Sequence, residues 1–380
     1  MSSGSVATRL TPDELERPEV TDAWRALAEL RSNPFLTPEW YRSWLEAHPD
    51  EDSFAIAWRV DGELRGVLPL LRAGSPPIRV LRFAGGRRGD WFTPACRIEE
   101  ERPMAVACAA ALSAERSAWQ LLSLDRIDDE SAWPVALWEA GARRGLGPGR
   151  ARRGDVLPYI RFDDGGYEGW LANRSRNFRS QLGRRRRKLE RDHGLTFRMT
   201  EDPRALDADL SCFYRLHEER WDSRDGESSL TPDARETHRT FAAAALERGW
   251  LRLWIAEADG RPAAAWYGWR LGERYCFSLS GLSPDYERLA LGTVLLAHTI
   301  EHAAGEGAAI YDLMWGDEGY KERFETGRRT ASSWTLGRRG HPVRTLARSA
   351  DRLRAAARDL PDGVKDPAKR ALGVIGRGRV

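Results

Sequence analysis

Apolar runs alternate with polar turn residues in the same way at two places in the chain. One pair of runs flanks Asp61-Gly62 and the other flanks Asp259-Gly260. The runs are residues 54–60, 64–71, 251–258 and 262–271. Two apolar runs joined by Asp-Gly are typical of a β-hairpin, because both turn positions favour a positive φ. Each hairpin follows a predicted helix and precedes another predicted strand, so the pattern indicates an internal duplication of an α/β unit.

Helical spacing is clearest in two segments. Thr37, followed by proline, marks the start of an aromatic-rich helix, because its hydroxyl can cap the first turn. Residues 173–191 place Phe178, Leu182 and Leu189 at near-helical spacing among many arginines, which predicts a helix with one thin apolar seam. The positive charge favours an anionic partner, namely cofactor phosphates, nucleic acid or an acidic lipid surface, and a solvated face is the alternative.

Residues 274–280 form a predicted strand that leads through a turn into an apolar helix ending near Ala304. A helix N-terminus presents unpaired N–H groups and a positive dipole end, so this turn can bind a pyrophosphate, and Arg288 and Gly292 would favour that contact. The apolar run 309–314 is expected to lie parallel to the first strand. No Walker or G-x-G-x-x-G motif occurs, which argues against binding of a nucleoside triphosphate or a dinucleotide.

A polar segment follows that second strand directly. Residues 311–324 read YDLMWGDEGYKERF, in which three carboxylates lie within the seven residues 312–318 and a lysine follows closely. Gly316 and Gly319 permit a turn with close backbone approach. Because loops at strand ends commonly carry catalytic residues, we interpret this turn as a candidate site, with a solvated strand connection as the alternative.

Length and composition narrow the class of protein. A chain of 380 residues exceeds the usual size of one domain, and its 41% hydrophobic residues and 16 tryptophans suffice for a large core, so two domains are expected. The four cysteines include no C-x-x-C pair, which predicts neither a disulfide framework nor a zinc site and fits a reducing cytoplasm. No apolar run is long enough to cross a bilayer and no secretory pattern begins the chain. We therefore expect a soluble cytoplasmic protein without a metal.

The net charge is +3, with basic residues concentrated near the C-terminus. Residues 344–360 space leucine and alanine along one face, which predicts a basic C-terminal amphipathic helix followed by a flexible tail. The helix could dock on the protein or associate weakly with a membrane surface. Its alanine-rich apolar face lacks aromatic anchors, which favours docking.

The order of these elements resembles the GNAT acyltransferase superfamily, in particular its CelD-like branch, which is found beside cellulose-synthesis genes and is allied to the Fem peptidyltransferases. Four stretches carry the resemblance: residues 34–40 (PFLTPEW), 66–70 (GVLPL), 177–189 and 316–321 (GDEGYK). The resemblance spans about residues 30 to 335. It implies an α/β fold with tandem GNAT-like units, each a mixed twisted sheet flanked by helices. The implied division is an N-terminal segment (1–30), a first unit (31–165), a second, catalytic unit (166–336) and the basic C-terminal region (337–380).

The resemblance also implies the chemistry: an acyl group passes from acyl-CoA, such as acetyl-CoA, to an amine on a small molecule, a sugar or a cell-envelope or polysaccharide precursor. Arg288 to Gly292 would occupy the family's pyrophosphate loop, although Arg288 stands four residues before Gly292 and Thr293-Val294 follows, which departs from the usual Arg/Gln-x-x-Gly-x-Gly/Ala pattern. The predicted acyl-CoA contacts are Ser280, Leu282, Arg288, Leu291, Gly292 and Thr293.

Aminolysis of a thioester needs a proton acceptor for the amine and a donor for the departing thiolate. Asp312 and Asp317 are the candidate bases, and Tyr320 and Lys321 are candidates for positioning the acceptor or protonating the thiolate. Trp266, Tyr267, Trp269, Trp315 and Glu318 are predicted to contact the acceptor. Each of these residues also has an ordinary structural role as the alternative, and His217 is a weaker candidate that more simply serves packing.

Two other functions stay open at this point. The Fem resemblance allows aminoacyl-tRNA as the donor, with the cationic helix following its phosphates. The departure in the pyrophosphate loop allows a non-catalytic assembly module in polysaccharide production.

Overall fold

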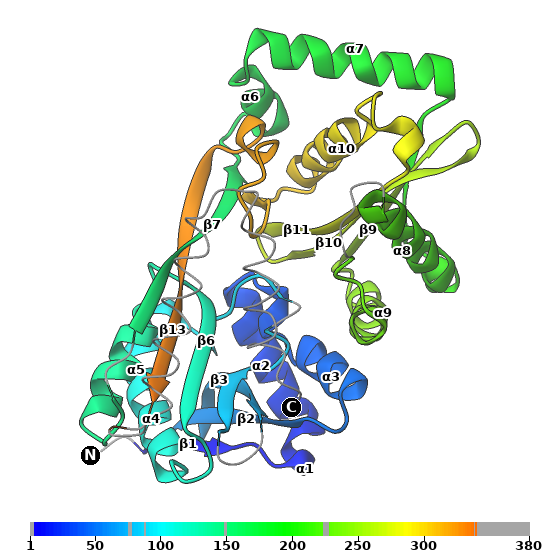
Figure 1. Cartoon of the computed structure of the whole chain (residues 1–380). Helices are drawn as coiled ribbons and strands as arrows, with labels where there is room; N and C mark the ends of the chain where they lie inside the picture. Colours follow the sequence, from blue (N-terminus) through cyan, green and yellow to red (C-terminus); the bar gives the residue numbers. More distant parts are fainter. Residues whose placement is uncertain are drawn as a thin grey trace, which may run out of the picture.

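The computed structural model describes residues 4–74, 78–86, 89–147, 150–222, 228–337 and 339. Within these residues, one continuous 13-stranded mixed sheet runs through the molecule in the order β1-β2-β3-β4-β6-β13-β7-β12-β11-β10-β9-β8, with β5 paired to β3 (Figure 1). The strands are β1 (Ser5–Arg9), β2 (Asp52–Val60), β3 (Glu63–Ala73), β4 (Val80–Phe83), β5 (Ala95–Cys96), β6 (Leu121–Asp128), β7 (Arg150–Arg161), β8 (Thr196–Met199), β9 (Leu251–Ala258), β10 (Arg261–Leu271), β11 (Arg274–Leu282), β12 (Ile310–Asp312) and β13 (Gly327–Gly337). The predicted mixed α/β architecture is confirmed.

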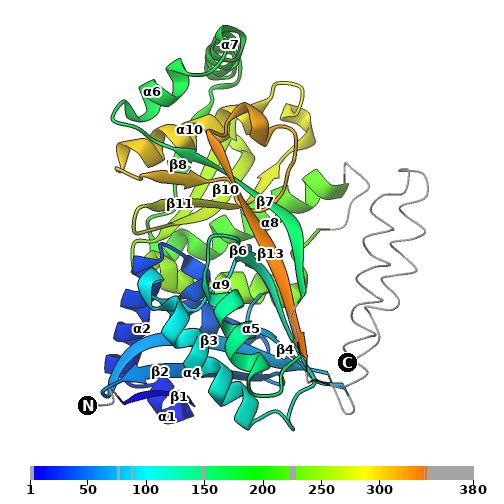
Figure 2. The same ribbon diagram turned by 90° about the vertical axis from the view of Figure 1, so that its left-hand side faces the viewer.

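Helices cover both faces of this sheet (Figure 2). They are α1 (Pro12–Leu15), α2 (Pro18–Leu30), α3 (Pro38–Ala47), α4 (Glu101–Ala114), α5 (Trp133–Ala142), α6 (Gly166–Ala172), α7 (Arg176–His193), α8 (Leu206–Asp222), α9 (Pro232–Glu247) and α10 (Leu291–Gly305). The predicted cationic helix is α7, and its predicted apolar seam of Phe178, Leu182 and Leu189 is buried. The predicted C-terminal helix at 344–360 lies outside the described residues.

The two halves of the sheet repeat one topology. In the first, the hairpin β2–β3 leads to β4, which runs parallel to β6. In the second, the hairpin β9–β10 leads to β11, which runs parallel to β12. Both predicted Asp-Gly turns have positive φ at both positions, as a type I′ turn requires. The structure therefore contains the duplicated α/β unit that the hairpin pattern predicts.

The last strand of each half completes the other half. β7 follows the first half in the chain but pairs with β12, whereas β13 follows the second half and pairs with β6. β7 and β13 also pair with each other along most of their length. We call β1–β6 with β13 the first unit, and β7–β12 the second unit. Residues 1–30 were expected as a separate segment, but residues 5–30 supply β1 and α2 to the first unit, because β1 pairs with β2.

Two hydrophobic clusters lie on the two faces of the second unit. α6, α7 and α10 pack on one face around Trp266 and Tyr311. α8 and α9 pack on the other face, and this cluster is continuous with the core of the first unit. Trp269 contacts Phe35 and Trp40 of the first unit through edge-to-face ring contacts, with ring centroids 5.5 and 6.4 Å apart. The two units therefore share one core.

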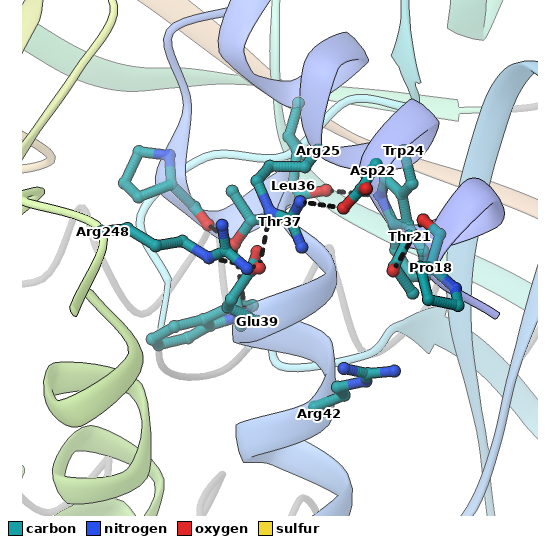
Figure 3. Close-up of polar contacts among 12 residues, drawn as sticks. Pro18, Thr21, Asp22, Trp24, Arg25, Leu36, Thr37, Glu39, Arg42 and Arg248 are labelled. Atoms are coloured by element: carbon teal, nitrogen blue, oxygen red, sulfur yellow. Dashed lines mark hydrogen bonds and ion pairs between the residues drawn. The ribbon is translucent and has the colours of Figure 1, made fainter. Parts of the chain in front are cut away.

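A buried carboxylate fixes α3 against α9 (Figure 3). Glu39 on α3 accepts from Arg25 of α2 at 2.7 Å and from Arg248, which follows α9, at 2.8 Å. Thr37 caps α3 through the N–H of Trp40, as predicted. The PFLTPEW stretch thus acts in the contact between units. No described helix is long and apolar enough to span a membrane.

Candidate functional site

β11 and β12 pair only briefly and then diverge. Their parallel register covers Arg274 to Cys276 on β11 and ends at Asp312 on β12. β11 continues to Leu282, so its last six residues have no β12 partner beside them. Such an opening exposes one edge of a strand inside the sheet, where an extended ligand can bond with the backbone as an added strand would.

A cavity of about 260 Å³ occupies this opening. Its walls come from β10, β11, the loop before α10, the first turns of α10, Tyr320 and one residue of α8. Lining residues are Arg220, Ala265, Trp266, Phe277, Ser280, Gly281, Leu282, Glu287, Ala290, Gly292, Thr293, Leu295, Leu296 and Tyr320. The walls are mostly apolar, with polar groups at the α10 end, which suits a ligand that is apolar along its length and polar at one end.

The N-terminus of α10 closes one end of the cavity. Ala290 precedes the helix in the left-handed conformation (φ 56°) and supplies no side-chain cap, so the first N–H groups of α10 face the cavity uncapped. A Cβ on Gly292 would meet only Leu282 Cδ2, at 3.7 Å, which leaves space beside the backbone. Arg288 is exposed on the preceding turn, and Leu291 is fully buried. The helix terminus favours an anionic group here, whereas the Glu287 carboxylate, which lines the cavity, opposes one, and Arg288 is not among the lining residues.

The turn after β12 has a strained backbone. Met314 has φ 61°, a left-handed value that is rare for residues other than glycine, and Gly316 has φ 120°. The Lys321 ammonium holds the turn together by donating to the carbonyls of Met314 (3.4 Å) and Trp315 (2.9 Å) and to Glu318 (2.8 Å). Lys321 is therefore buried, whereas Tyr320 reaches the cavity wall and Trp315 is 46% exposed.

Asp312 lies beneath this turn and is fully buried. Its carboxylate accepts from Arg274 (2.8 Å), from Arg329 (2.6 Å) and from the N–H of Met314 (2.9 Å). These three donors occupy both carboxylate oxygens. The geometry favours a structural role for Asp312 in holding β11, β12 and β13 together.

Only some of the other predicted residues line the cavity. Ser280, Leu282, Gly292, Thr293, Trp266 and Tyr320 line the cavity. Tyr267 and Trp269 are fully buried in the core against α9 and are not brought to it, because β10 turns these rings to the opposite face. Asp317 is exposed on the turn, and the carboxylate that Lys321 contacts belongs to Glu318.

One residue of α8, Arg220, lines the cavity, and no sequence motif identifies it. Arg220 donates to the Ser280 hydroxyl, and His217 Nδ1 lies 2.9 Å from the Ser280 carbonyl. Burial lowers the pKa of His217, so this imidazole is neutral at physiological pH. The contacts hold α8 against the open part of β11.

Asp90 of the first unit is a further residue that sequence reasoning missed. It follows β4, its carbonyl accepts from Arg126 Nε at 2.6 Å, and the Arg126 guanidinium lies 5.1 Å from the centre of the Trp315 ring on the turn after β12. Burial raises the pKa of Asp90 from 3.8 to about 6, and the charges of Arg126 and Lys321 partly offset this effect. Asp90 is not among the residues that line the cavity.

Comparisons with known proteins agree with this geometry. Residues 176–322 match the family model described as an acetyltransferase (GNAT) domain. No curated protein matches the chain.

Solved structures extend the likeness to both units. FemX is 11% identical, with a TM-score of 0.59 over 90% of this chain and 99% of its own. L-PGS from Bacillus licheniformis is 14% identical, with a TM-score of 0.55 over 90% and 96%. The C-terminal domain of a putative lysylphosphatidylglycerol synthetase from Agrobacterium fabrum is 12% identical, with a TM-score of 0.53 over 88% and 94%. At these identities the likeness shows a shared fold.

The matched domain and the fold define the class of protein. The protein is an acyltransferase, and its residues 176–322 are similar to the GNAT acetyltransferase domain. The CelD-like branch is a prediction that these findings do not address.

Proposed function

We propose that this protein transfers an acyl group from acyl-CoA to a primary amine in the cavity between β11 and the turn after β12. The observation that carries the proposal is the opening between β11 and β12 with an uncapped helix N-terminus at one end. The free edge of β11 can bond with the amide groups of the pantetheine arm, and the α10 N-terminus and Arg288 can bind the pyrophosphate. Apolar walls at Trp266 and Phe277 suit the acyl chain.

The protein's contribution to the reaction is positioning and proton transfer. The N–H groups of β11 can hydrogen-bond to the thioester carbonyl and stabilise its developing negative charge. As the amine nitrogen bonds to the carbonyl carbon, the C–S bond breaks and its electron pair stays on sulfur. Tyr320, on the cavity wall, is placed to give the thiolate a proton, and the amine loses its proton to a carboxylate. The resemblance to the CelD-like branch extends the proposal to an acceptor that is a sugar or an envelope precursor.

Aminoacyl-tRNA is the second candidate donor. The shared fold with FemX and the resemblance to Fem peptidyltransferases support it. The outer face of α7 supplies a specific observation, because it displays exposed basic side chains over the α10 side of the second unit (Figure 1). These residues are Arg176, Arg179, Arg184, Arg187 and Lys188. A donor held this way would lose affinity steeply as salt is added.

Gly292→Glu tests the acyl-CoA assignment. The new side chain has room but places a carboxylate among the phosphates, so acyl-CoA affinity should fall at least tenfold, or about 1.4 kcal/mol. Gly305→Glu is the matched control, since it adds the same side chain at the open far end of the same helix. Binding is followed by calorimetry with acetyl-CoA and a longer acyl-CoA. Unchanged affinity in a folded Gly292→Glu protein would remove the assignment, and binding of aminoacyl-tRNA alone would favour the second donor.

A further inference from the structure

A polar groove of about 490 Å³ lies where α7 begins, and we call it the α7 groove. Its walls come from the connection between α6 and α7, from the first turns of α7 and from the short 3₁₀ helix η5 (Lys321–Arg323). The polar side chains that line it include Asn173, Arg174, Ser175, Gln181, Glu322 and Arg323. Its volume is within the range of small-molecule sites, and it shares no described lining residue with the cavity beside β11.

A buried aromatic cluster fixes the walls of the α7 groove to each other. Phe324, directly after η5, packs against Trp170 of α6 and against Phe178 of α7, with ring centroids 6.1 and 5.3 Å apart. Trp170 Nε1 also donates to the Phe324 carbonyl at 2.8 Å. Because all three rings are buried, the two walls form a rigid frame, which lowers the entropic cost of ordering their side chains around a ligand.

Arg174 and Arg323 bring two guanidinium groups to the groove from different elements. Nη1 of Arg174 donates to the carbonyls of Phe324 (3.3 Å) and Glu325 (2.8 Å), whereas no described residue accepts from its Nε or Nη2. Arg323 is exposed, its Cζ lies 5.4 Å from the centre of the Phe178 ring, and it has no carboxylate partner among the described residues. Both guanidinium groups therefore keep N–H donors for a ligand.

The charge of the groove favours an anion. Glu322 is the only carboxylate among its described lining residues, and it pairs at 3.0 Å with Arg328, which lies outside the lining. The lining therefore has an excess of positive charge from Arg174 and Arg323. Two guanidinium groups match the double charge and the three oxygens of a phosphate monoester better than the single charge of a carboxylate.

Amide side chains supply the remaining polar lining. Gln181 Nε2 donates to Asn177 Oδ1 at 2.9 Å, which leaves the Gln181 carbonyl oxygen as an acceptor. The Asn173 amide has no partner among the described residues. Amides both donate and accept, as the hydroxyl groups of a sugar require, and the groove is much larger than a single phosphate. The lining therefore suits a phosphate that is carried on a sugar.

The helix η5 places the groove next to the proposed site. Tyr320, the residue before η5, lines the cavity beside β11, whereas Glu322 and Arg323 line the groove. We propose that the α7 groove binds a sugar phosphate, a phosphate monoester on a sugar, of a substrate whose reacting end lies in the cavity. The link with the cavity rests on the proposed function. Two substrates carry this chemistry, namely CoA with its ribose 3′-phosphate and an amino-sugar phosphate as the acceptor.

The test measures the binding of two ligand pairs to the full-length protein by calorimetry. CoA is compared with dephospho-CoA, which lacks only the 3′-phosphate, and glucosamine 6-phosphate is compared with glucosamine. Wild type should bind the phosphorylated member of one pair about tenfold more tightly. Arg323→Gln should remove this preference and leave the affinity for the other member unchanged, and Arg323→Lys should keep part of it. Arg102→Gln, at an exposed position of α4, is the control and should behave as wild type.

The pair that shows the preference identifies the source of the phosphate. A preference in neither pair, or one that both Arg323→Gln and Arg174→Gln retain as folded proteins, would overturn the proposal. Failure of the proposed function is distinguishable, because wild type would then bind neither acetyl-CoA nor CoA. The glucosamine pair alone would decide in that case, and equal binding of its two members would overturn the α7 groove as a phosphate site.

Discussion

Replacing Asp90 by asparagine should stabilise the protein at neutral pH. Burial raises the pKa of this carboxyl from 3.8 to about 6, so the folded state binds its proton more tightly than the unfolded state. The stabilisation from the protonated group is complete below pH 3.8 and is lost as the pH rises through 6. Each pKa unit corresponds to about 1.4 kcal/mol, so ionisation lowers the free energy of unfolding by about 3 kcal/mol at pH 7.

Asparagine does not titrate, so the stability difference between Asp90→Asn and wild type should change by about 2.4 kcal/mol in favour of the variant between pH 4 and pH 7. Urea unfolding of both proteins at several pH values measures this difference. Comparing pH values removes those effects of the substitution on stability that do not depend on pH. A difference that does not depend on pH would refute the reasoning, because it would show that the Asp90 carboxyl titrates alike in the folded and unfolded states.

Two further substitutions test the buried ion pairs. Glu39→Gln should lower the free energy of unfolding by about 1.5–3 kcal/mol, since it weakens the contacts with Arg25 and Arg248, and Glu46→Gln on the exposed face of α3 is the matched control. A loss equal to that of the control would contradict a role for Glu39 in joining the units. Asp312→Ala should cost about 3–5 kcal/mol, because two arginines lose their buried partner. If chemical denaturation shows that Asp312→Ala lowers the free energy of unfolding by less than about 1 kcal/mol, solvent already compensates the charges of the two arginines.

The sequence pattern predicted the repeated α/β unit because short-range interactions determine its hairpins and helices. The Asp-Gly turns at Asp61 and Asp259 adopt the positive φ values that make their flanking runs hairpins. Burial of Phe178, Leu182 and Leu189 follows from their spacing on α7. The exchange of β7 and β13 has no such local cause. Either strand could pair with the edge strand of either unit. The observed pairs, β7 with β12 and β13 with β6, depend on contacts between residues far apart in the chain.

The candidate site also combines residues that short-range geometry brings together with residues that only long-range contacts bring together. Ser280, Leu282, Gly292 and Thr293 belong to one strand–turn–helix segment, so their approach to one cavity follows from short-range geometry. Tyr267 and Trp269 differ from Trp266 only in the face of β10 that they occupy. Asp90 stands in no motif and is more than 200 residues from the turn that it contacts, so sequence spacing gave no reason to select it.

The exchange of strands brings the first unit next to the candidate site of the second unit. Because β13 runs from the turn after β12 into the first unit, that turn lies at the junction of the two units. Arg126 of β6 donates to the carbonyls of Gly89 and Asp90 and also lies against the Trp315 ring of that turn. The first unit and the turn beside the cavity therefore keep a fixed relative position. Glu39, Trp269 and the paired strands β7 and β13 supply that constraint far from the reacting atoms.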